Sequence, residues 1–541
     1  MPTEQQNYGA VFTRRWVVEL MLDSCEYLPE EDLALGLATE PSCGDGAFLL
    51  PMAERLTASL RAHGRRLEEG ANALRAFDLQ PQHVEQCRGL LTEQLTTEGW
   101  NPAEVHDVVE HWVRHGDYLL TAQPETRWVI GNPPYIRSED LDPEVRAEYL
   151  RRCSTMTAGS DIFVGFIETG LRSLSAEGRL SFIVADRWLH NTYGRKLRRL
   201  VLDDYAVELL YELHGTDAFA EDVSAYPAII QIRRGEQGPV RYAKGQPTFD
   251  EKAAERLQDW AGDAKPAPLH DRDFRAAVLP DWFDTDGPWP SASPDRLLLL
   301  EELEERCRPL EDPETGTRLG IGIATGADGT FVVHERHDIE EERLLPLVTT
   351  RQIRSGRVEW QDTWLANPWN GDRTLVNLTR YPGLREHLEA SEAILRKRHI
   401  ARKASEDCWF GTIDKIQPGL AERPKLLFQD MKATIQPVLD EGGHYPHHNL
   451  YWLVSEKWDL RVLGGLLLSK VAEMFVDAYG VKMRGGTLRF QAQYLRLIRV
   501  PDPEEIPEAV ARRLAQAFEV RDAEKATEAA LEAYGLTELP D

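Results

Sequence analysis

The chain has 541 residues, of which 42% are hydrophobic and 28% charged, and its formal net charge is −27 at pH 7. This length predicts two or three domains, and the composition is that of an ordinary globular protein. No run of about 18 uncharged apolar residues occurs. The first residues lack the apolar core of a signal peptide, so we expect a cytoplasmic protein without a membrane span.

Residues 1–245 alternate short apolar runs with amphipathic helix patterns. Most of the runs are apolar on both faces, as in strands buried between two layers of helices. Strands separated by helices predict an α/β fold with a Rossmann-like, doubly wound sheet. The expected strands are ALGLATEPS (34–42), ALRAFDL (73–79), RWVIGNPP (127–134), GRLSFIVA (178–185), AVELLYELH (206–214) and AIIQIRR (228–234).

The remaining chain changes character twice. Residues 246–294 include a stretch rich in Pro, Asp and Ser, which predicts a linker. Residues 295–505 mix helical patterns such as GLREHLEASEAILRKRH with strand-like runs such as NLYWLV, and predict a second, mixed α/β domain. Residues 506–541 have amphipathic patterns and predict a helical tail.

The cysteines indicate a reducing compartment. They lie at positions 25, 43, 87, 153, 307 and 408, without a CxxC pair and without zinc-like spacing of Cys and His. We therefore expect reduced thiols and no metal site.

A glycine turn follows the first expected strand, in Glu40-Pro41-Ser42-Cys43-Gly44-Asp45-Gly46-Ala47-Phe48. Gly44 and Gly46 allow the backbone to approach a ligand closely, and the helix that follows offers free N–H groups to an anion. Taken alone, the segment is equally an ordinary strand-to-helix turn.

Two acidic residues follow later strands. Asp78 ends a strand, where a carboxylate can accept hydrogen bonds from ribose hydroxyls, although an N-cap aspartate would look the same. Asp117 follows in HGDYLL, where it can accept from an adenine amino group or be a plain loop residue.

The segment Asn132-Pro133-Pro134-Tyr135 has the most specific chemistry. Two prolines force the chain out of the sheet in a rigid turn. The Asn132 amide oxygen and the Pro133 carbonyl then become fixed acceptors beside the aromatic face of Tyr135. Such acceptors suit a planar aromatic amine whose nitrogen attacks a methyl sulfonium. A plain Pro-Pro turn with a packed Tyr is the alternative.

Together these motifs resemble the gamma-class, TaqI-like amino-methyltransferases of DNA. Gly9-Ala10-Val11-Phe12-Thr13 is similar to their N-terminal segment, although Arg14 stands where the family usually has Pro. The resemblance implies S-adenosyl-L-methionine as cofactor, an N6-adenine in DNA as substrate and a C-terminal target recognition domain. It implies cofactor contacts from Thr13, Pro41, Cys43, Gly44, Gly46, Phe48, Asp78, Asp117 and Asn132. It implies a catalytic role for Asn132, Pro133, Pro134 and Tyr135, and places Asp161 and Phe163 near them.

The target base must leave the duplex for this chemistry, so we expect base flipping. A later aromatic side chain is then expected to stack on the base. Phe219 fits that position best, with Tyr226 as the second choice and a purely structural Phe219 as the alternative.

The acidic net charge argues against a nucleic-acid partner unless the charge is segregated. Two basic clusters predict such segregation, with double-stranded DNA passing between the two domains, although a solvated helix face is the plainer interpretation of either. The expected DNA contacts are Arg195, Lys196, Arg198 and Arg199 in the first domain, and Arg396, Lys397, Arg398, Arg402 and Lys403 on a helix of the second.

Three alternatives stay open. An N4-cytosine methyltransferase uses the same chemistry, but usually has Ser or Thr in place of Asn132. Protein-glutamine and ribosomal RNA methyltransferases also carry NPPY, but typically lack a large C-terminal region. A non-catalytic DNA-binding subunit would not need intact motifs. Restriction activity in the same chain is not expected, and a separate restriction or defence-system subunit is left open.

Overall fold

The computed structural model describes residues 13–219, 226–334, 338–400, 408–429, 431–432, 434–480, 488–489 and 492–540. The chain forms two compact units, Met1–Leu298 and Leu299–Asp541. No helix of the described ranges is long and apolar enough to cross a membrane. All six cysteines are free thiols.

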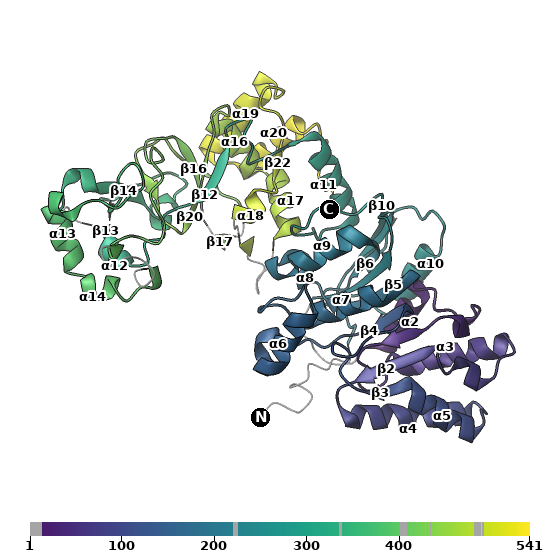
Figure 1. The fold of residues 1–541 in the computed structure, drawn as a ribbon. Coiled ribbons are helices and arrows are strands. Elements are labelled where there is room, and N and C mark those ends of the chain that lie inside the picture. Colours follow the sequence, from purple (N-terminus) through teal and green to yellow (C-terminus); the bar gives the residue numbers. More distant parts are fainter. Residues whose placement is uncertain are drawn as a thin grey trace. The chain divides into compact units, whose positions relative to one another are not determined.

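A ten-stranded sheet of order β3-β2-β1-β4-β5-β7-β6-β8-β10-β9 forms the centre of the first unit (Figure 1). Strands β3, β2, β1, β4 and β5 pair with one another in parallel, and β7 is antiparallel to both β5 and β6. The strands are β1 (Ala38–Glu40), β2 (Leu74–Asp78), β3 (Val113–His115), β4 (Thr126–Gly131), β5 (Leu174–Ala185), β6 (Tyr205–Glu212), β7 (Pro227–Arg234), β8 (Val240–Gly245), β9 (Leu269–His270) and β10 (Phe274–Leu279).

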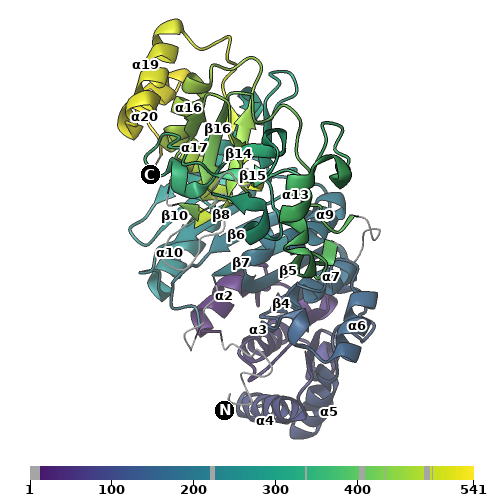
Figure 2. The same cartoon turned by 90° about the vertical axis from the view of Figure 1, so that its left-hand side faces the viewer.

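Helices cover both faces of this sheet, which explains why its strands are apolar on both sides. In Figure 2 the strands β5, β6 and β7 lie between one group that contains α2 and α10 and another that contains α7 and α9. Helix α10 packs on α2, α2 on α3 and α3 on α4, whereas α7 packs on α9, β5 and β7. The helices are α2 (Arg15–Ser24), α3 (Leu49–Ala62), α4 (Pro81–Thr97), α5 (Pro102–Trp112), α6 (Pro143–Arg152), α7 (Phe163–Ser173), α8 (Arg187–His190), α9 (Arg195–Asp204) and α10 (Glu251–Ala261).

The predicted doubly wound α/β fold is confirmed, and each of the six expected strands is present. Residues 246–294, predicted to be a linker, instead contain helix α10 and the two strands β9 and β10 of the sheet. The Pro- and Asp-rich stretch then packs back on this unit, where Trp289 contacts Trp188 at a ring distance of 5.5 Å. The boundary between the units falls at Leu298, inside helix α11 (Pro294–Arg306).

The second unit contains two four-stranded sheets, of order β12-β20-β16-β18 and β13-β15-β14-β19. The first is antiparallel throughout. Its strands are β12 (Arg318–Ile321), β16 (Lys425–Gln429), β18 (Val438–Asp440) and β20 (Leu450–Val454). Those of the second are β13 (Val332–Val333), β14 (Leu344–Val348), β15 (Trp364–Ala366) and β19 (Tyr445–Pro446). Two short pairs, β11 (Arg308–Pro309) with β22 (Arg499–Val500) and β17 (Met431–Lys432) with β21 (Leu488–Arg489), complete the pairing among these residues.

The predicted C-terminal tail is part of this second unit. Helices α19 (Glu508–Val520) and α20 (Ala523–Ala533) pack against α16 (Leu460–Leu468), which α17 (Lys470–Tyr479) follows (Figure 1). A Cβ on Gly465 would lie 2.4 Å from the Leu514 carbonyl oxygen, so a glycine is needed for the close approach of α16 and α19. The tail is therefore a packed layer rather than an appendage.

Candidate active site

The glycine turn joins β1 to α3. Gly44 and Gly46 have φ angles of +51° and +92°, which a residue with a Cβ rarely adopts. A Cβ on Gly44 would point into open space, whereas one on Gly46 would contact Leu50 and the Cys87 sulfur at 3.4 and 3.5 Å. The backbone of Gly44 therefore borders open space, and Gly46 allows the turn to pack on α4.

Asp78 closes this turn from the end of β2. Its Oδ2 accepts a hydrogen bond from the Gly44 N–H at 2.9 Å, and its Oδ1 accepts from the Gln80 N–H at 2.8 Å. The His83 ring nitrogen Nδ1 lies 3.3 Å from Oδ1. The carboxylate is 6% exposed and keeps further lone-pair sites for hydroxyl donors.

The NPPY segment leaves the sheet at the carboxyl end of β4, as the two prolines require. The Asn132 Nδ2 donates a hydrogen bond to Thr13 Oγ1 at 3.1 Å, which fixes the plane of the Asn132 amide. Thr13 is placed in turn by a β-bridge to Phe219, and the Arg14 N–H donates to the Ala218 carbonyl at 3.1 Å. Residues 9–12 lie outside the described ranges.

Two aromatic rings lie beside Tyr135 of the NPPY segment. Tyr135 lies 6.1 Å from Phe163 and 6.4 Å from Phe219, the latter pair edge to face at 81°. The Tyr135 hydroxyl donates to the Ile183 carbonyl at 3.3 Å, and burial raises its pKa above the ordinary value, so it stays neutral. Phe219 is buried and belongs to the core, while Tyr226 is exposed and stacks obliquely on His214. Asp161 forms a β-bridge with Arg137, two residues beyond Tyr135.

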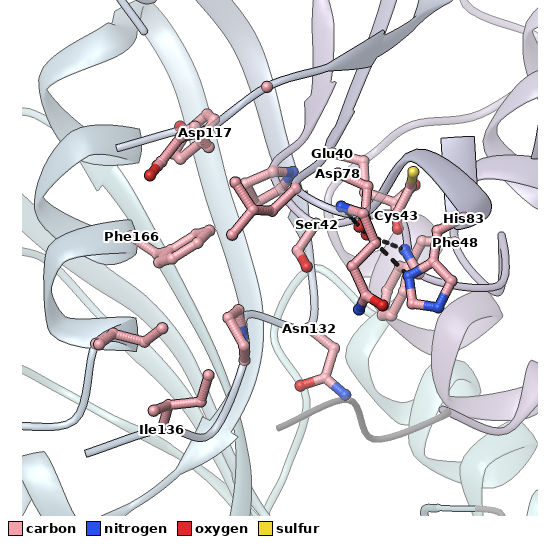
Figure 3. A pocket seen from close by; sticks show the side chains of 18 of the residues that line it. Glu40, Ser42, Cys43, Phe48, Asp78, His83, Asp117, Asn132, Ile136 and Phe166 are labelled. Carbon is pink, nitrogen blue, oxygen red and sulfur yellow. Dashed lines mark hydrogen bonds and ion pairs between the residues drawn. The ribbon is translucent and has the colours of Figure 1, made fainter. Parts of the chain in front are cut away.

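A cavity of about 350 Å³ opens at the carboxyl ends of β1, β2 and β4. In Figure 3, Asp117 and Phe166 lie on one side of it and Asp78 and His83 on the other, with Asn132 between. Eight of the nine predicted cofactor residues line this cavity: Thr13, Pro41, Cys43, Gly44, Phe48, Asp78, Asp117 and Asn132. Gly46 does not line the cavity, because it faces Leu50 and Cys87. Pro134 also lines it, whereas Pro133, Tyr135 and Phe219 do not.

Glu40 is a lining residue to which the sequence assigned no role. It is 1% exposed, and its Oε2 has no hydrogen-bond partner within the described part of the chain. Burial, reinforced by Cys87, Asp45 and Asp78, raises the pKa of its carboxyl well above the usual value. The signal that could have identified Glu40 in the sequence is a charged residue at the end of an otherwise apolar strand.

One side of the cavity is apolar and comes partly from residues that no motif marks. Ile136, Ile162 and Phe166 line it, and Phe166 is stacked on Tyr118 at 5.5 Å. Tyr149 of α6 donates its hydroxyl proton to Asp117 Oδ2 at 2.6 Å, and the Leu119 N–H donates to Oδ1 at 2.9 Å. Asp117 is thereby held at the rim beside a surface that fits a flat ring.

The basic cluster of the first unit divides into two kinds of residue. Arg195, Lys196 and Arg199 are exposed and, with Arg172, line a shallow hollow at the start of α9. Arg198 is only 1% exposed, and its guanidinium donates to the backbone carbonyls of Trp188, Asn191 and Asp286. The prediction that Arg198 contacts DNA does not fit this structure, because the Arg198 guanidinium is buried and donates to carbonyls of α8, of Asn191 and of Asp286.

The cluster of the second unit divides in the same way. Helix α14 (Glu392–Leu395) ends before the cluster begins, so residues 396–398 lie in a turn rather than on the expected helix. Arg396 and Lys397 are exposed, and Arg396 pairs with Glu392 at 2.7 Å. Arg398 is partly buried and donates to the carbonyls of Thr325, Trp409 and Gly411. Arg402 and Lys403 lie outside the described ranges.

The sheet order and a cavity at the carboxyl ends of its parallel strands define a doubly wound α/β protein, a class in which ligands bind at that edge of the sheet. Comparison with known proteins narrows this class. Residues 121–219 match the family model described as Eco57I restriction-modification methylase. The chain is 40% identical to the type II methyltransferase M.PaeR7I of Pseudomonas aeruginosa, over 98% of this chain and 92% of that protein. It is 38% identical to M.XhoI of Xanthomonas vasicola, over 99% of this chain and 98% of that protein.

The chain therefore belongs to the type II methyltransferases of restriction-modification systems. A solved structure of the type IIL restriction-modification enzyme MmeI in complex with DNA has a similar fold. It matches with a TM-score of 0.54 and 12% sequence identity, over 100% of this chain and 78% of that one.

Proposed function

We propose that the protein is a gamma-class DNA methyltransferase that transfers a methyl group from S-adenosyl-L-methionine to N6 of adenine in duplex DNA. The observation that carries the proposal is the position of Asn132-Pro133-Pro134-Tyr135. The segment lies at the carboxyl end of β4, beside a cavity that is also lined by the glycine turn and by the carboxyl groups of Glu40, Asp78 and Asp117.

The cavity fits S-adenosyl-L-methionine at three points. The buried Glu40 Oε2 suits the ammonium group of an amino acid, since an unpartnered buried carboxyl gains most from a cation. Asp78 suits the ribose hydroxyls, and Asp117, beside Ile162 and Phe166, suits a purine and its amino group. When bound there, the cofactor supplies a methyl group activated by a positively charged sulfur.

Asn132 and Pro133 orient the amine that receives the methyl group. The Asn132 Oδ1 and the Pro133 carbonyl each accept one N–H of the target amine. Both acceptors are preorganised, because the amide plane is fixed by Thr13 and the turn by two prolines. Hydrogen bonds in these directions hold the nitrogen lone pair out of conjugation with the ring and aim it into the cavity.

The aromatic rings offset part of the cost of extruding the base. Unpairing an adenine costs a few kcal/mol, and stacking on an aromatic side chain returns about 1–3 kcal/mol. Tyr135 supplies this face, and its ring is held by the Ile183 hydrogen bond and by Phe163. Phe219, which is buried and edge-on to Tyr135, braces that ring in this structure and would need to turn to stack on the base itself.

The duplex is proposed to lie on the exposed cations of both units. Arg195, Lys196 and Arg199 stand in the first turns of α9, where the helix dipole adds to their positive potential and favours a phosphate. Arg396 and Lys397 are the corresponding cations of the second unit, which is proposed to be the target recognition domain. These contacts fix position and do not read sequence.

The test is methyl transfer from labelled cofactor to mixed-sequence duplex DNA, followed by digestion to nucleosides. Label is expected in N6-methyladenine. Label in N4-methylcytosine would overturn the choice of base, and label only in protein or RNA would overturn the choice of DNA.

A further inference from the structure

Two histidines and an aspartate converge in the second unit, and none of them belongs to a motif of the sequence. Asp328 is the first residue of α12 (Asp328–Phe331), and His447 and His448 join β19 to β20. One ligand-type atom of each of the three side chains lies within 4.8 Å of the others. His447 is 8% exposed and Asp328 is 46% exposed, so the group has one buried and one open side.

The contacts within this group are hard to satisfy with protons alone. His447 Nε2 lies 3.1 Å from Asp328 Oδ2 and also 3.1 Å from His448 Nδ1. A ring nitrogen carries at most one proton, and the ionised carboxylate can only accept. If Nε2 is protonated, one proton must serve both neighbours; if it is not, its lone pair faces the carboxylate oxygen. A cation at the centre would be attracted by all three lone pairs at once.

The spacing also suits a metal of the zinc type. Tetrahedral zinc binds imidazole nitrogen and carboxylate oxygen at about 2.0–2.1 Å, which places neighbouring ligand atoms about 3.3 Å apart. Two of the three separations here are 3.1 Å. Two imidazoles with one carboxylate favour zinc, cobalt or nickel over magnesium or calcium, which prefer oxygen ligands alone.

Backbone pairing holds the three residues in place. The His447 N–H donates to the Val348 carbonyl at 3.0 Å, and the His448 N–H donates to the Ile323 carbonyl at 3.0 Å. A β-bridge joins Ile323 to His447. The Thr325 hydroxyl donates to Asp328 Oδ1, which leaves Oδ2 directed at the histidines. A hydrogen bond to the second oxygen of a ligating carboxylate, such as the one from Thr325, orients that ligand in metal sites.

We propose that Asp328, His447 and His448 bind one divalent transition-metal ion, with water on the exposed side completing the coordination. The ion ties the segment 322–328, which precedes and opens α12, to the β19–β20 turn. The site is independent of the proposed methyl transfer, and nothing in it requires the cofactor or DNA.

The experiment uses the untagged full chain, stripped of metal with a chelator and dialysed. Titration with Zn²⁺ by calorimetry and with Co²⁺ by visible absorption is expected to show one equivalent per chain, with Co²⁺ bands of tetrahedral type. Zn²⁺ is expected to raise the unfolding temperature. His447→Ala, His448→Ala and Asp328→Asn should each weaken binding at least 100-fold, and Thr325→Val about 10–100-fold.

His334→Ala is the matched control, since His334 is an exposed histidine of the same unit outside the group. It should bind Zn²⁺ like the wild type. Asp328→Asn keeps the size of an exposed side chain, so it tests the site even where His447→Ala fails to fold. Absence of stoichiometric binding by the wild type would overturn the proposal, as would binding that survives the replacement of Asp328 and His448.

Discussion

The two units of the chain differ in how they build their sheets. In the first, strands β1 to β5 form a parallel region, and helices follow β1, β2 and β4 along the chain, so a central strand such as β4 is buried along most of its length. In the second, short strands pair across long stretches of chain; β12, for example, pairs with β20 more than a hundred residues later. The first arrangement follows from local pattern, and the second depends on contacts that no local pattern encodes.

This difference decides where function can be read. At the edge of a parallel sheet, residues that follow several strands meet whatever the details of the helices, so Gly44, Asp78 and Asn132 are brought together. In the second unit, the convergence of Asp328 with His447 spans 119 positions and depends on how two small sheets meet their loops.

Asn132→Ala is expected to have the largest effect of the substitutions, a loss of kcat, and tests the catalytic role assigned to the first unit. Loss of one preorganised hydrogen-bonding group costs about 10²–10³-fold in kcat. Cofactor binding should change little, because the carboxyl groups that we assign to it are untouched. Single-turnover methyl transfer and calorimetric binding of the cofactor separate the two quantities.

Asn101→Ala is the matched control. Asn101 caps α5 by accepting from the Ala103 N–H, far from the motifs, so its loss should cost about 1 kcal/mol of stability and leave kcat unchanged. If Asn132→Ala abolishes cofactor binding instead of turnover, the roles assigned to Asn132 and to the acids are wrong.

The comparison also separates what the sequence predicts from what it does not. The six strands follow from apolar runs, whereas the nine predicted cofactor residues depend on turn chemistry together with the resemblance to a known family; the structure brings eight of the nine to one cavity. Tyr149 and Phe166 were missed because α6 and α7 are placed against the cavity by packing, which no spacing records. Residues 246–294 resemble a linker in the sequence because their prolines outweigh the pattern of a six-residue strand, β10, which pairs with β8 and β9.

Arg198→Ala and Arg195→Ala compare a buried arginine with an exposed arginine of the same basic cluster. Removing Arg198 leaves the buried Trp188 carbonyl without the Arg198 donor, while the Asn191 carbonyl still accepts from the Gly194 N–H, so the loss should cost about 1–3 kcal/mol of unfolding free energy. Removing the exposed Arg195 should leave stability within about 0.5 kcal/mol. It should lower the salt dependence of DNA binding by about one phosphate contact.

Chemical denaturation measures the unfolding free energy, and DNA-binding titrations over a range of salt concentrations measure the salt dependence. Arg398→Ala and Arg396→Ala form the same pair in the second unit, since Arg398 holds three carbonyls and Arg396 is exposed. A loss of stability from Arg195→Ala equal to that from Arg198→Ala would contradict the division of the cluster.

Asp78→Asn tests the cofactor side of the first unit and should act on affinity more than on rate. The amide keeps one acceptor for the Gly44 or Gln80 N–H but loses the charge-assisted bonds offered to ribose hydroxyls. Cofactor affinity should fall about 10–100-fold, which corresponds to the 1.5–3 kcal/mol of a hydrogen bond to a charged group. A rise in KM for DNA without a change in cofactor affinity would refute this assignment.

The smallest effect is expected from pH, and it should have opposite signs in the two units. Glu40 is buried without a partner among the described residues, and burial raises its pKa. Burial would also raise the pKa of Asp440, but hydrogen bonds from His444 and Lys425 together with the Lys425 charge lower it instead. Glu40 thus lacks a cationic partner among the described residues, whereas Asp440 is paired with the Lys425 ammonium group.

The signs follow from proton binding. As pH rises above about 4.3, the unfolded state releases the Glu40 proton while the fold retains it, so this residue makes the protein less stable. Glu40→Gln should therefore raise the unfolding temperature, by an amount that grows from pH 4 towards neutrality, while it weakens cofactor binding. Asp440 contributes stability above its unfolded pKa that is lost as pH falls, so Asp440→Asn should destabilise at neutral pH and progressively less in acid.

The measurement is the difference in unfolding temperature between each variant and the wild type across pH, which removes the contribution of groups common to both. Because a bound ammonium group would favour ionised Glu40, saturating cofactor should reverse the stabilisation by Glu40→Gln and leave the destabilisation by Asp440→Asn unchanged. A stabilised Glu40→Gln that binds cofactor as tightly as the wild type would place the ammonium elsewhere. Burial of Glu40 would then destabilise the folded protein without serving cofactor binding.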